Sequence, residues 1–139
     1  MRAKTQLSVL FDLFEGESAA IAQQAPIFQL AATRLTDRMN LACVGVRLTI
    51  AWSLQYSNSL KYSGLSITMW KGEREIYNDT TRMAEARYRF DRLANGSLGW
   101  RRDDKEARFF QTEALVDYHL KEMLNSIPGL KDYLDRAGK

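Results

Sequence analysis

The sequence contains one cysteine and one histidine in 139 residues. A disulfide scaffold and a cysteine-based zinc finger both need several thiols, so a single cysteine excludes them. One histidine makes a histidine-rich metal site equally unexpected, and we therefore expect no metal ion and no cofactor. The sequence also lacks a phosphate-binding glycine loop, an HExxH motif and a GxSxG motif. These absences argue against the enzyme classes that such motifs mark.

The chain is poor in proline, with only Pro26 and Pro128, and it has no internal repeat or low-complexity tract. Its hydrophobic fraction of 45% and charged fraction of 27% are typical of globular proteins and exclude intrinsic disorder. The length predicts a single domain, residues 1–139. The net charge of +3 is a mild excess compared with that of a dedicated nucleic-acid-binding domain.

Long hydrophobic runs are also missing. The segment that begins at Leu7 superficially resembles a secretory signal, but Asp12 interrupts its apolar run and no small-residue cleavage site follows. The longest other apolar stretch, Leu41–Leu54, is too short to span a bilayer as a helix and carries Arg47 at its centre. We therefore expect a soluble, cytoplasmic protein without membrane contact, with Cys43 reduced.

The first 41 residues have a helical hydrophobic period. Apolar residues at positions i, i+3, i+4 and i+7 predict an amphipathic helix: Leu7, Leu10, Phe11 and Phe14. The pair Glu15-Gly16 is expected to end this helix, and Ser18 can cap a second one. A further helical segment is predicted from Pro26 to Met39. The pattern leaves open whether Pro26 kinks one helix or separates two.

The period then changes from helical to alternating. Hydrophobic residues occupy every even position of residues 44–56, with small or polar residues between them: Val44, Val46, Leu48, Ile50, Trp52, Leu54 and Tyr56. This alternation predicts a long strand with one buried face. A second alternating strand is predicted at residues 65–69, and a short piece around residues 76–77.

The next segment permits an argument about strand register. A two-residue turn at Asn95-Gly96 would place Phe90 and Trp100 on opposite faces of the sheet. A three-residue bulged loop, Ala94 to Gly96, instead pairs Phe90 with Trp100 on one face. We prefer the bulged loop because it gathers the apolar side chains. The connections are too short for crossovers, so the sheet is expected to be antiparallel.

The last part of the chain returns to a helical period. An apolar stripe predicts a helix closed by Pro128-Gly129: Val116, Leu120, Met123, Leu124 and Ile127. Asp117 and Lys121 are placed to form an ion pair on its exposed side. Residues 103–111 are ambiguous, because Asp103 and Glu106 could cap a helix while Ala107 to Phe110 could extend the sheet.

These elements predict an α+β fold. We expect one antiparallel meander of four to five strands, with N-terminal helices and a C-terminal helix packed on one face. The predicted boundaries are residues 1–41 for the helical start, 43–103 for the sheet and 104–139 for the helical end. The aromatic residues on the even face are expected to form core beneath the helices: Trp52, Tyr88, Phe90 and Trp100.

Candidate catalytic residues are sparse. His119 titrates near neutrality, but no nucleophile motif accompanies it, so we interpret it as a partly buried structural residue. Cys43 is expected to pack as a small hydrophobe. Two carboxylate sets could hold magnesium, but acidic loops are usually solvated turns: Glu73 with Glu75, and Asp103 with Asp104 and Glu106. Asp91 with Asp103, Lys105 and Glu106 resembles a nuclease cluster only loosely.

The basic residues suggest a binding surface. Strand alternation sends arginines and an aromatic ring to the face opposite the predicted core: Arg47, Trp70, Arg87, Arg89 and Arg101. Arginine and aromatic residues are enriched at protein interfaces, so the first hypothesis is a non-enzymatic regulator, inhibitor, adaptor or assembly subunit that binds another protein or itself. The second hypothesis is a single-stranded nucleic-acid binder, and the third an enzyme that uses His119 or the loop carboxylates. The alternative to all three hypotheses is that this face is ordinary solvated surface, with its arginines paired to nearby carboxylates.

Overall fold

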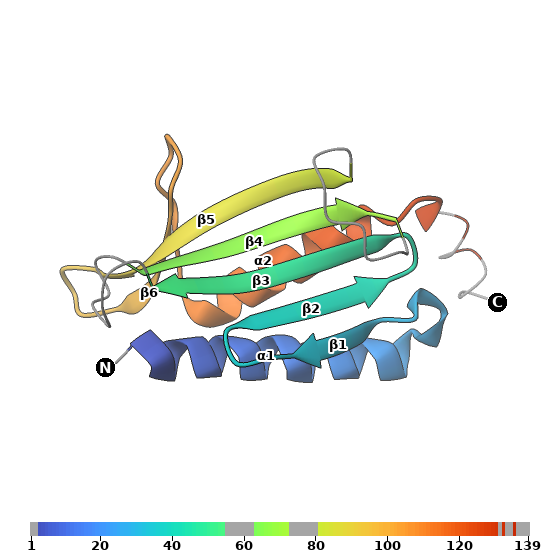
Figure 1. The fold of residues 1–139 in the computed structure, drawn as a ribbon, viewed down its shortest axis with the longest axis horizontal. Helices are drawn as coiled ribbons and strands as arrows, with labels where there is room; N and C mark the ends of the chain where they lie inside the picture. The colour runs from blue at the N-terminus through green and yellow to red at the C-terminus, as the bar shows by residue number, and fades with distance from the viewer. Residues whose placement is uncertain (1–2, 55–62, 73–80, 131, 133–134, 136–139) are drawn as a thin grey trace.

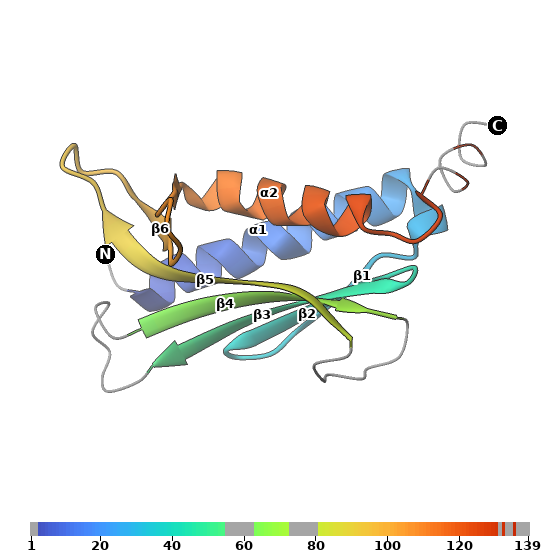
Figure 2. The same cartoon turned by 90° about the horizontal axis from the view of Figure 1, so that it is seen from above.

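The computed structural model describes residues 3–54, 63–72, 81–130, 132 and 135. Within this part of the chain the elements run in the following order: α1 (Ala3–Gln24), η1 (Pro26–Phe28), β1 (Ala31–Arg34), β2 (Arg38–Cys43), β3 (Val46–Leu54), β4 (Ser63–Lys71), β5 (Arg82–Arg92), β6 (Leu98–Arg102), β7 (Phe109–Phe110) and α2 (Thr112–Asn125). The strands form one antiparallel sheet in chain order, and α1 and α2 cover the same face (Figures 1 and 2). The α+β class and the meander are confirmed, but the sheet has seven strands instead of four to five.

The core lies between this covered side of the sheet, called the inner face, and the two helices. The inner face contributes the even positions of β3 and alternating positions of its neighbours, as the amphipathic pattern predicted. The helices contribute their apolar stripes: Leu7, Leu10, Phe11 and Phe14 from α1, and Leu115, Val116, Leu120 and Met123 from α2. All of these side chains are buried.

Aromatic side chains from β3, β5 and β6 meet in one part of the core. Trp100 is fully buried, and its ring lies edge-on to Trp52 at 5.9 Å and to Phe90 at 5.3 Å between centroids. Its indole Nε1 donates a hydrogen bond to the hydroxyl of Thr112, the first residue of α2, at 3.2 Å. The predicted core role of these rings is confirmed, and Trp100 also fixes the start of α2.

The N-terminal helix is continuous, which corrects the predicted break at Glu15-Gly16. Gly16 is exposed, and no other group lies where a Cβ would be. The helix continues through this glycine, which lowers helix stability by about 1 kcal/mol relative to alanine. Burial of Phe14 and Ser18 one turn apart carries the packed stripe across the glycine. Packing on the sheet therefore outweighs the local helix-breaking signal.

Residues 31–34 and 38–43 form strands, so the predicted helical start, 1–41, is wrong where these strands lie. Pro26 begins a single 3-10 turn, and the chain then enters the hairpin of β1 and β2. Met39 and Leu41 are buried at alternate positions, a period-2 pattern that overlaps the helical spacing of the preceding residues. Pairing with β3 decides between the two periods, because it satisfies the backbone of β2 along its whole length.

The long alternating strand is confirmed from Val46 to Leu54, but its predicted start at residue 44 is wrong. Cys43 pairs with Val46, and the two residues between them form a tight turn. Gly45 adopts a positive φ of 78°, which favours glycine. The turn changes the buried face from odd positions in β2 to even positions in β3. Residues 55–56 and the short piece at 76–77 lie outside the described residues.

The bulged hairpin between β5 and β6 is confirmed. Phe90 pairs with Trp100, and the loop contains Gly96 with a φ of 89°. The strand predicted at residues 65–69 is also confirmed as the central part of β4, paired with both β3 and β5. Hydrophobic pattern and turn chemistry therefore predicted this half of the sheet correctly.

The segment left ambiguous at residues 103–111 extends the sheet. Phe109 and Phe110 form β7, opposite Arg101 and Trp100 of β6. The predicted helical end, 104–139, is therefore wrong at its beginning, because α2 begins only at residue 112. The apolar stripe of α2 and its exposed Asp117–Lys121 ion pair, at 3.0 Å, are confirmed.

Among the described residues, no helix is both long enough and apolar enough to cross a membrane.

Candidate functional site

The side of the sheet away from α1 and α2, called the outer face, is covered by neither helix (Figure 2). The strand registers send one set of alternating side chains to it. Near β2 to β4 it is mostly small and polar, with Asn40, Thr49, Ser66 and Thr68. Among the described charged residues on this face, arginines outnumber carboxylates: Arg38, Arg47, Arg82, Arg87, Arg89 and Arg101 against Glu85 and Asp91.

Three of the predicted site residues gather at the β5–β6 end of the outer face: Arg87, Arg89 and Arg101, called the arginine cluster. Arg89 lies directly opposite Arg101 across the two strands, and Arg87 is two positions before Arg89 on the same face. Like charges directly opposite each other in a sheet destabilise it. The hairpin register that buries Phe90 against Trp100 enforces this arrangement.

Two carboxylates bracket the arginine cluster. Glu85 accepts a hydrogen bond from Arg87 Nε at 2.7 Å, and Asp91 accepts one from Arg101 Nε at 3.0 Å. The bond from Arg101 lowers the pKa of the Asp91 carboxyl below its ordinary value. Among the described residues Arg89 forms no direct ion pair, although its charge also acts on Asp91, and the three arginines exceed the two carboxylates by one positive charge.

The other two predicted site residues do not join this cluster. Arg47 points to the outer face but is only 3% exposed, so the expectation of an exposed arginine is wrong there. Its guanidinium donates hydrogen bonds to the carbonyl oxygens of Gly72, at 3.2 Å, and Lys71, at 3.4 Å. Arg47 therefore ties β3 to the end of β4 and acts as a structural residue.

Trp70 lies opposite Arg47 across β3 and β4, on the outer face that strand alternation predicted for it. It is half-buried, and its indole Nε1 donates a hydrogen bond to the hydroxyl of Thr49 at 3.1 Å. That hydroxyl donates in turn to the side-chain oxygen of Asn40 at 3.1 Å. The ring thus belongs to a polar network on the outer face and is not an isolated stacking platform.

Phe109 is a residue at this site that the sequence argument missed. It lies opposite Arg101 in β7, and the Arg101 guanidinium lies over its ring at 5.3 Å from the centroid. Arg101 also donates to the backbone carbonyl of Ala107 at 2.8 Å. The sequence allowed a strand at residues 107–110, which would have placed Phe109 in the sheet, but it allowed a helix in this segment equally well.

His119 is buried on α2, as the structural interpretation predicted. Its Nε2 shares a hydrogen bond with the hydroxyl of Tyr88 at 2.7 Å. Burial, together with the nearby positive charge of Arg102, lowers the pKa of His119 to about 3. Burial also raises the pKa of Tyr88 to about 12. Both side chains are therefore neutral near pH 7 and form a structural link between β5 and α2.

Cys43 is buried at the end of β2, and burial raises the pKa of its thiol to about 11. A thiol with such a pKa is almost fully protonated near pH 7, and the protonated form is a weak nucleophile and a poor metal ligand. Cys43 therefore fits the core role expected of it.

Two of the three carboxylates between β6 and β7, Asp104 and Glu106, are engaged in local contacts. Asp104 accepts a hydrogen bond from the backbone N–H of Ala107 at 2.8 Å and pairs with Arg102 at 3.0 Å. Glu106 lies 3.5 Å from Arg108. Within the described part of the chain, no three cysteine, histidine or acidic side chains are grouped closely enough to hold a metal ion. Glu73 and Glu75 lie outside the described residues.

Comparison of the chain with protein-family models, curated proteins and solved structures finds no match. Its function must therefore be inferred from the geometry of its own residues.

Proposed function

We propose that the protein is a non-enzymatic interaction module that binds an acidic segment of another protein through the arginine cluster. The observation that carries the proposal is the direct opposition of Arg89 and Arg101 on the uncovered face. This opposition costs stability in the free protein. A carboxylate from a partner would accept hydrogen bonds from both guanidinium groups and remove the repulsion.

Two features favour a protein partner over single-stranded nucleic acid. Stacking of bases needs exposed aromatic faces, whereas Trp70 is half-buried in a polar network and Phe109 lies beneath Arg101. The cluster is also bracketed by Glu85 and Asp91, which would repel a continuous phosphate backbone. An acidic protein segment can instead place a single carboxylate between the arginines and neutral residues beside Glu85 and Asp91.

The buried groups support a non-enzymatic role. General acid–base chemistry needs a group that changes its protonation near the working pH and reaches the substrate. His119 and Tyr88 are instead bonded to each other in the core, with pKa values of about 3 and about 12. Cys43 is buried with a pKa of about 11. None of the three is poised to exchange a proton near pH 7.

The test compares two triple variants that remove the same charge. The cluster variant carries Arg87→Ser, Arg89→Ser and Arg101→Ser. The control variant removes three exposed cations that lie outside the cluster: Arg92→Ser, Lys105→Ser and Lys121→Ser. Each tagged protein is used for affinity purification from the cells that naturally produce it, with and without nuclease digestion. Light scattering on each purified protein measures self-association.

The proposal predicts an acidic protein that the wild type and the control variant retain after nuclease digestion. The cluster variant should retain at least about tenfold less of it, as expected for loss of charge-assisted hydrogen bonds. Capture that nuclease abolishes, with a salt dependence that becomes shallower in the cluster variant, would instead establish nucleic-acid binding. Equal capture by both variants would show that the cluster is ordinary solvated surface.

A further inference from the structure

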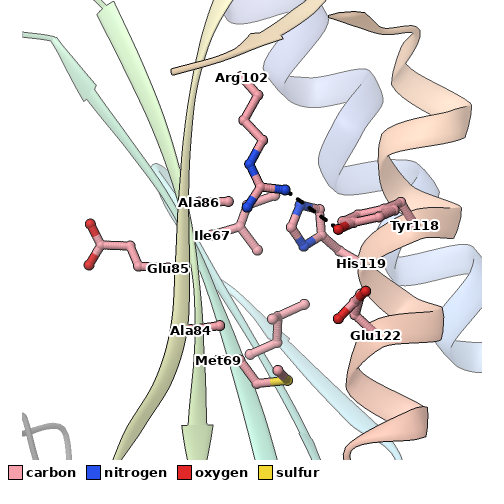
Figure 3. Close-up of a pocket in the computed structure, with 10 residues that line it drawn as sticks. Ile67, Met69, Ala84, Glu85, Ala86, Arg102, Tyr118, His119 and Glu122 are labelled. Carbon is pink, nitrogen blue, oxygen red and sulfur yellow. Dashed lines mark hydrogen bonds between the residues drawn. The ribbon is translucent and has the colours of Figure 1, made fainter. Parts of the chain in front are cut away.

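A cavity of about 60 Å³ lies on the side of β5 that faces away from the arginine cluster, between α2 and the inner face (Figure 3). Ala84 and Ala86 cause it, because their short side chains leave a gap between β5 and α2. Ile67 and Met69 of β4 line its apolar wall. The volume exceeds what one water molecule needs and is far below the 300 Å³ or more of typical drug-sized sites. The cavity is partly open to solvent, and the space within it therefore fits only a small group.

Charged groups of opposite sign flank the cavity at different ends. The guanidinium of Arg102 enters from β6, and the carboxylate of Glu122 enters from α2 (Figure 3). Arg102 uses Nε for Asp104, at 3.0 Å, and Nη1 for the hydroxyl of Tyr118, at 3.5 Å. The structure pairs its Nη2 with no described residue, and it gives Glu122 no cationic partner among them.

The remaining polar groups at the cavity carry no competing charge. His119 lines the cavity and is neutral and bonded to Tyr88 behind it, as described above, and the hydroxyl of Tyr118 accepts a hydrogen bond from Arg102. Glu85 belongs to the lining through its position on β5, but its carboxylate points away to the outer face (Figure 3). The cavity thus offers one cation, one anion and an apolar wall.

We infer that this cavity binds a small zwitterion of the amino-acid class, with its carboxylate at Arg102 and its ammonium group at Glu122. A simple anion would be attracted by Arg102 but repelled by Glu122. A simple cation would be attracted by Glu122 but repelled by Arg102. A zwitterion presents one charge to each of these groups. A small apolar substituent would pack against Ile67 and Met69, whereas the volume excludes large aromatic side chains. The inference is independent of the outer face.

The test is an amide NMR titration of the wild-type protein with four probes. L-Alanine carries both charges, N-acetyl-L-alanine lacks the ammonium group, L-alanine methyl ester lacks the carboxylate, and L-tryptophan is too large. L-Alanine should cause saturable shifts at Ala84, Ala86 and Glu122. The two blocked probes should bind at least about tenfold more weakly, because each loses a charge-assisted hydrogen bond and faces an unpaired like charge. L-Tryptophan should cause no saturable shift.

Two single variants distinguish recognition from a general loss of structure. Glu122→Gln removes the repulsion of anions, so N-acetyl-L-alanine should become the better ligand. Arg102→Gln should reverse the preference towards the methyl ester. Glu113→Gln on α2 and Arg92→Gln on β5 are the matched controls and should behave as the wild type.

Three results with these probes and variants would each overturn the inference, and a fourth concerns the variants alone. They are the absence of saturable shifts with L-alanine, equal binding of all the small probes, and variants that bind alanine unchanged. A variant that loses binding of every probe without reversing the preference would also count against it.

Discussion

Acidification should destabilise this protein through His119, and the structure gives the size of the effect. The imidazole is buried and bonded to Tyr88, with a pKa of about 3 in the folded protein against an ordinary value of 6.5. Between these two pH values the unfolded chain binds a proton that the folded chain excludes. The stability contributed by neutral His119 is therefore fully present above pH 6.5 and is lost as the pH falls towards 3.

The linkage relation converts this difference into free energy. One proton taken up on unfolding changes the free energy of unfolding by about 1.4 kcal/mol per pH unit. Acidification from pH 7 to pH 5 should therefore remove about 2 kcal/mol through His119 alone. A loss of this size is a large part of the 5–15 kcal/mol that stabilises a typical domain.

Guanidinium denaturation at pH 7, 6 and 5, followed by tryptophan fluorescence, measures the effect in the wild type and in His119→Gln. The variant should be less stable at pH 7, but its free energy of unfolding should fall by about 2 kcal/mol less on acidification, because glutamine does not titrate. Proton NMR gives a direct check, since the sequence has a single histidine. A midpoint of the His119 resonance near 6.5 in the folded protein, or parallel pH profiles of the two proteins, would refute the reasoning.

Two further predictions concern the core. Trp52→Ala and Phe90→Ala should each lower the free energy of unfolding by about 3–5 kcal/mol, and losses below about 1 kcal/mol in chemical denaturation would contradict the packing described. Gly99→Ala should cost about 1–3 kcal/mol, since its side chain would clash with the backbone carbonyl of Phe110. Gly16→Ala, in open space on α1, is the matched control, and it should raise the free energy of unfolding by about 0.5–1 kcal/mol, measured by thermal denaturation. Equal effects of the two substitutions would show that the close approach of β6 and β7 leaves room for a methyl group at residue 99.

The local signals of the sequence determined the part of the fold where one period is unambiguous. Alternation at even positions predicted β3, and the demand for a shared apolar face selected the bulged loop before β6. The same register places Arg89 opposite Arg101, so the central pair of the arginine cluster follows from the sequence. The stripe of α2 and the burial of His119 followed from helical spacing in the same way.

Tertiary structure decided the elements whose local signals conflict. Met39 and Leu41 fit a helix or a strand, and only pairing with β3 made them a strand, because a sheet neighbour satisfies the backbone that a helix would satisfy internally. Packing of α1 on the sheet likewise overrode the glycine at residue 16.

The surroundings of each charge also required the three-dimensional structure. Alternation gives the face on which Arg47 lies but not its burial beneath the end of β4, which depends on the carbonyl oxygens of Lys71 and Gly72. Likewise, Arg102 and Glu122 are 20 positions apart in the sequence and flank one cavity only because α2 packs against the inner face. The spacing of residues in the sequence determines to which side of a helix or strand each side chain points. Contacts between elements depend instead on how their hydrophobic surfaces pack against each other.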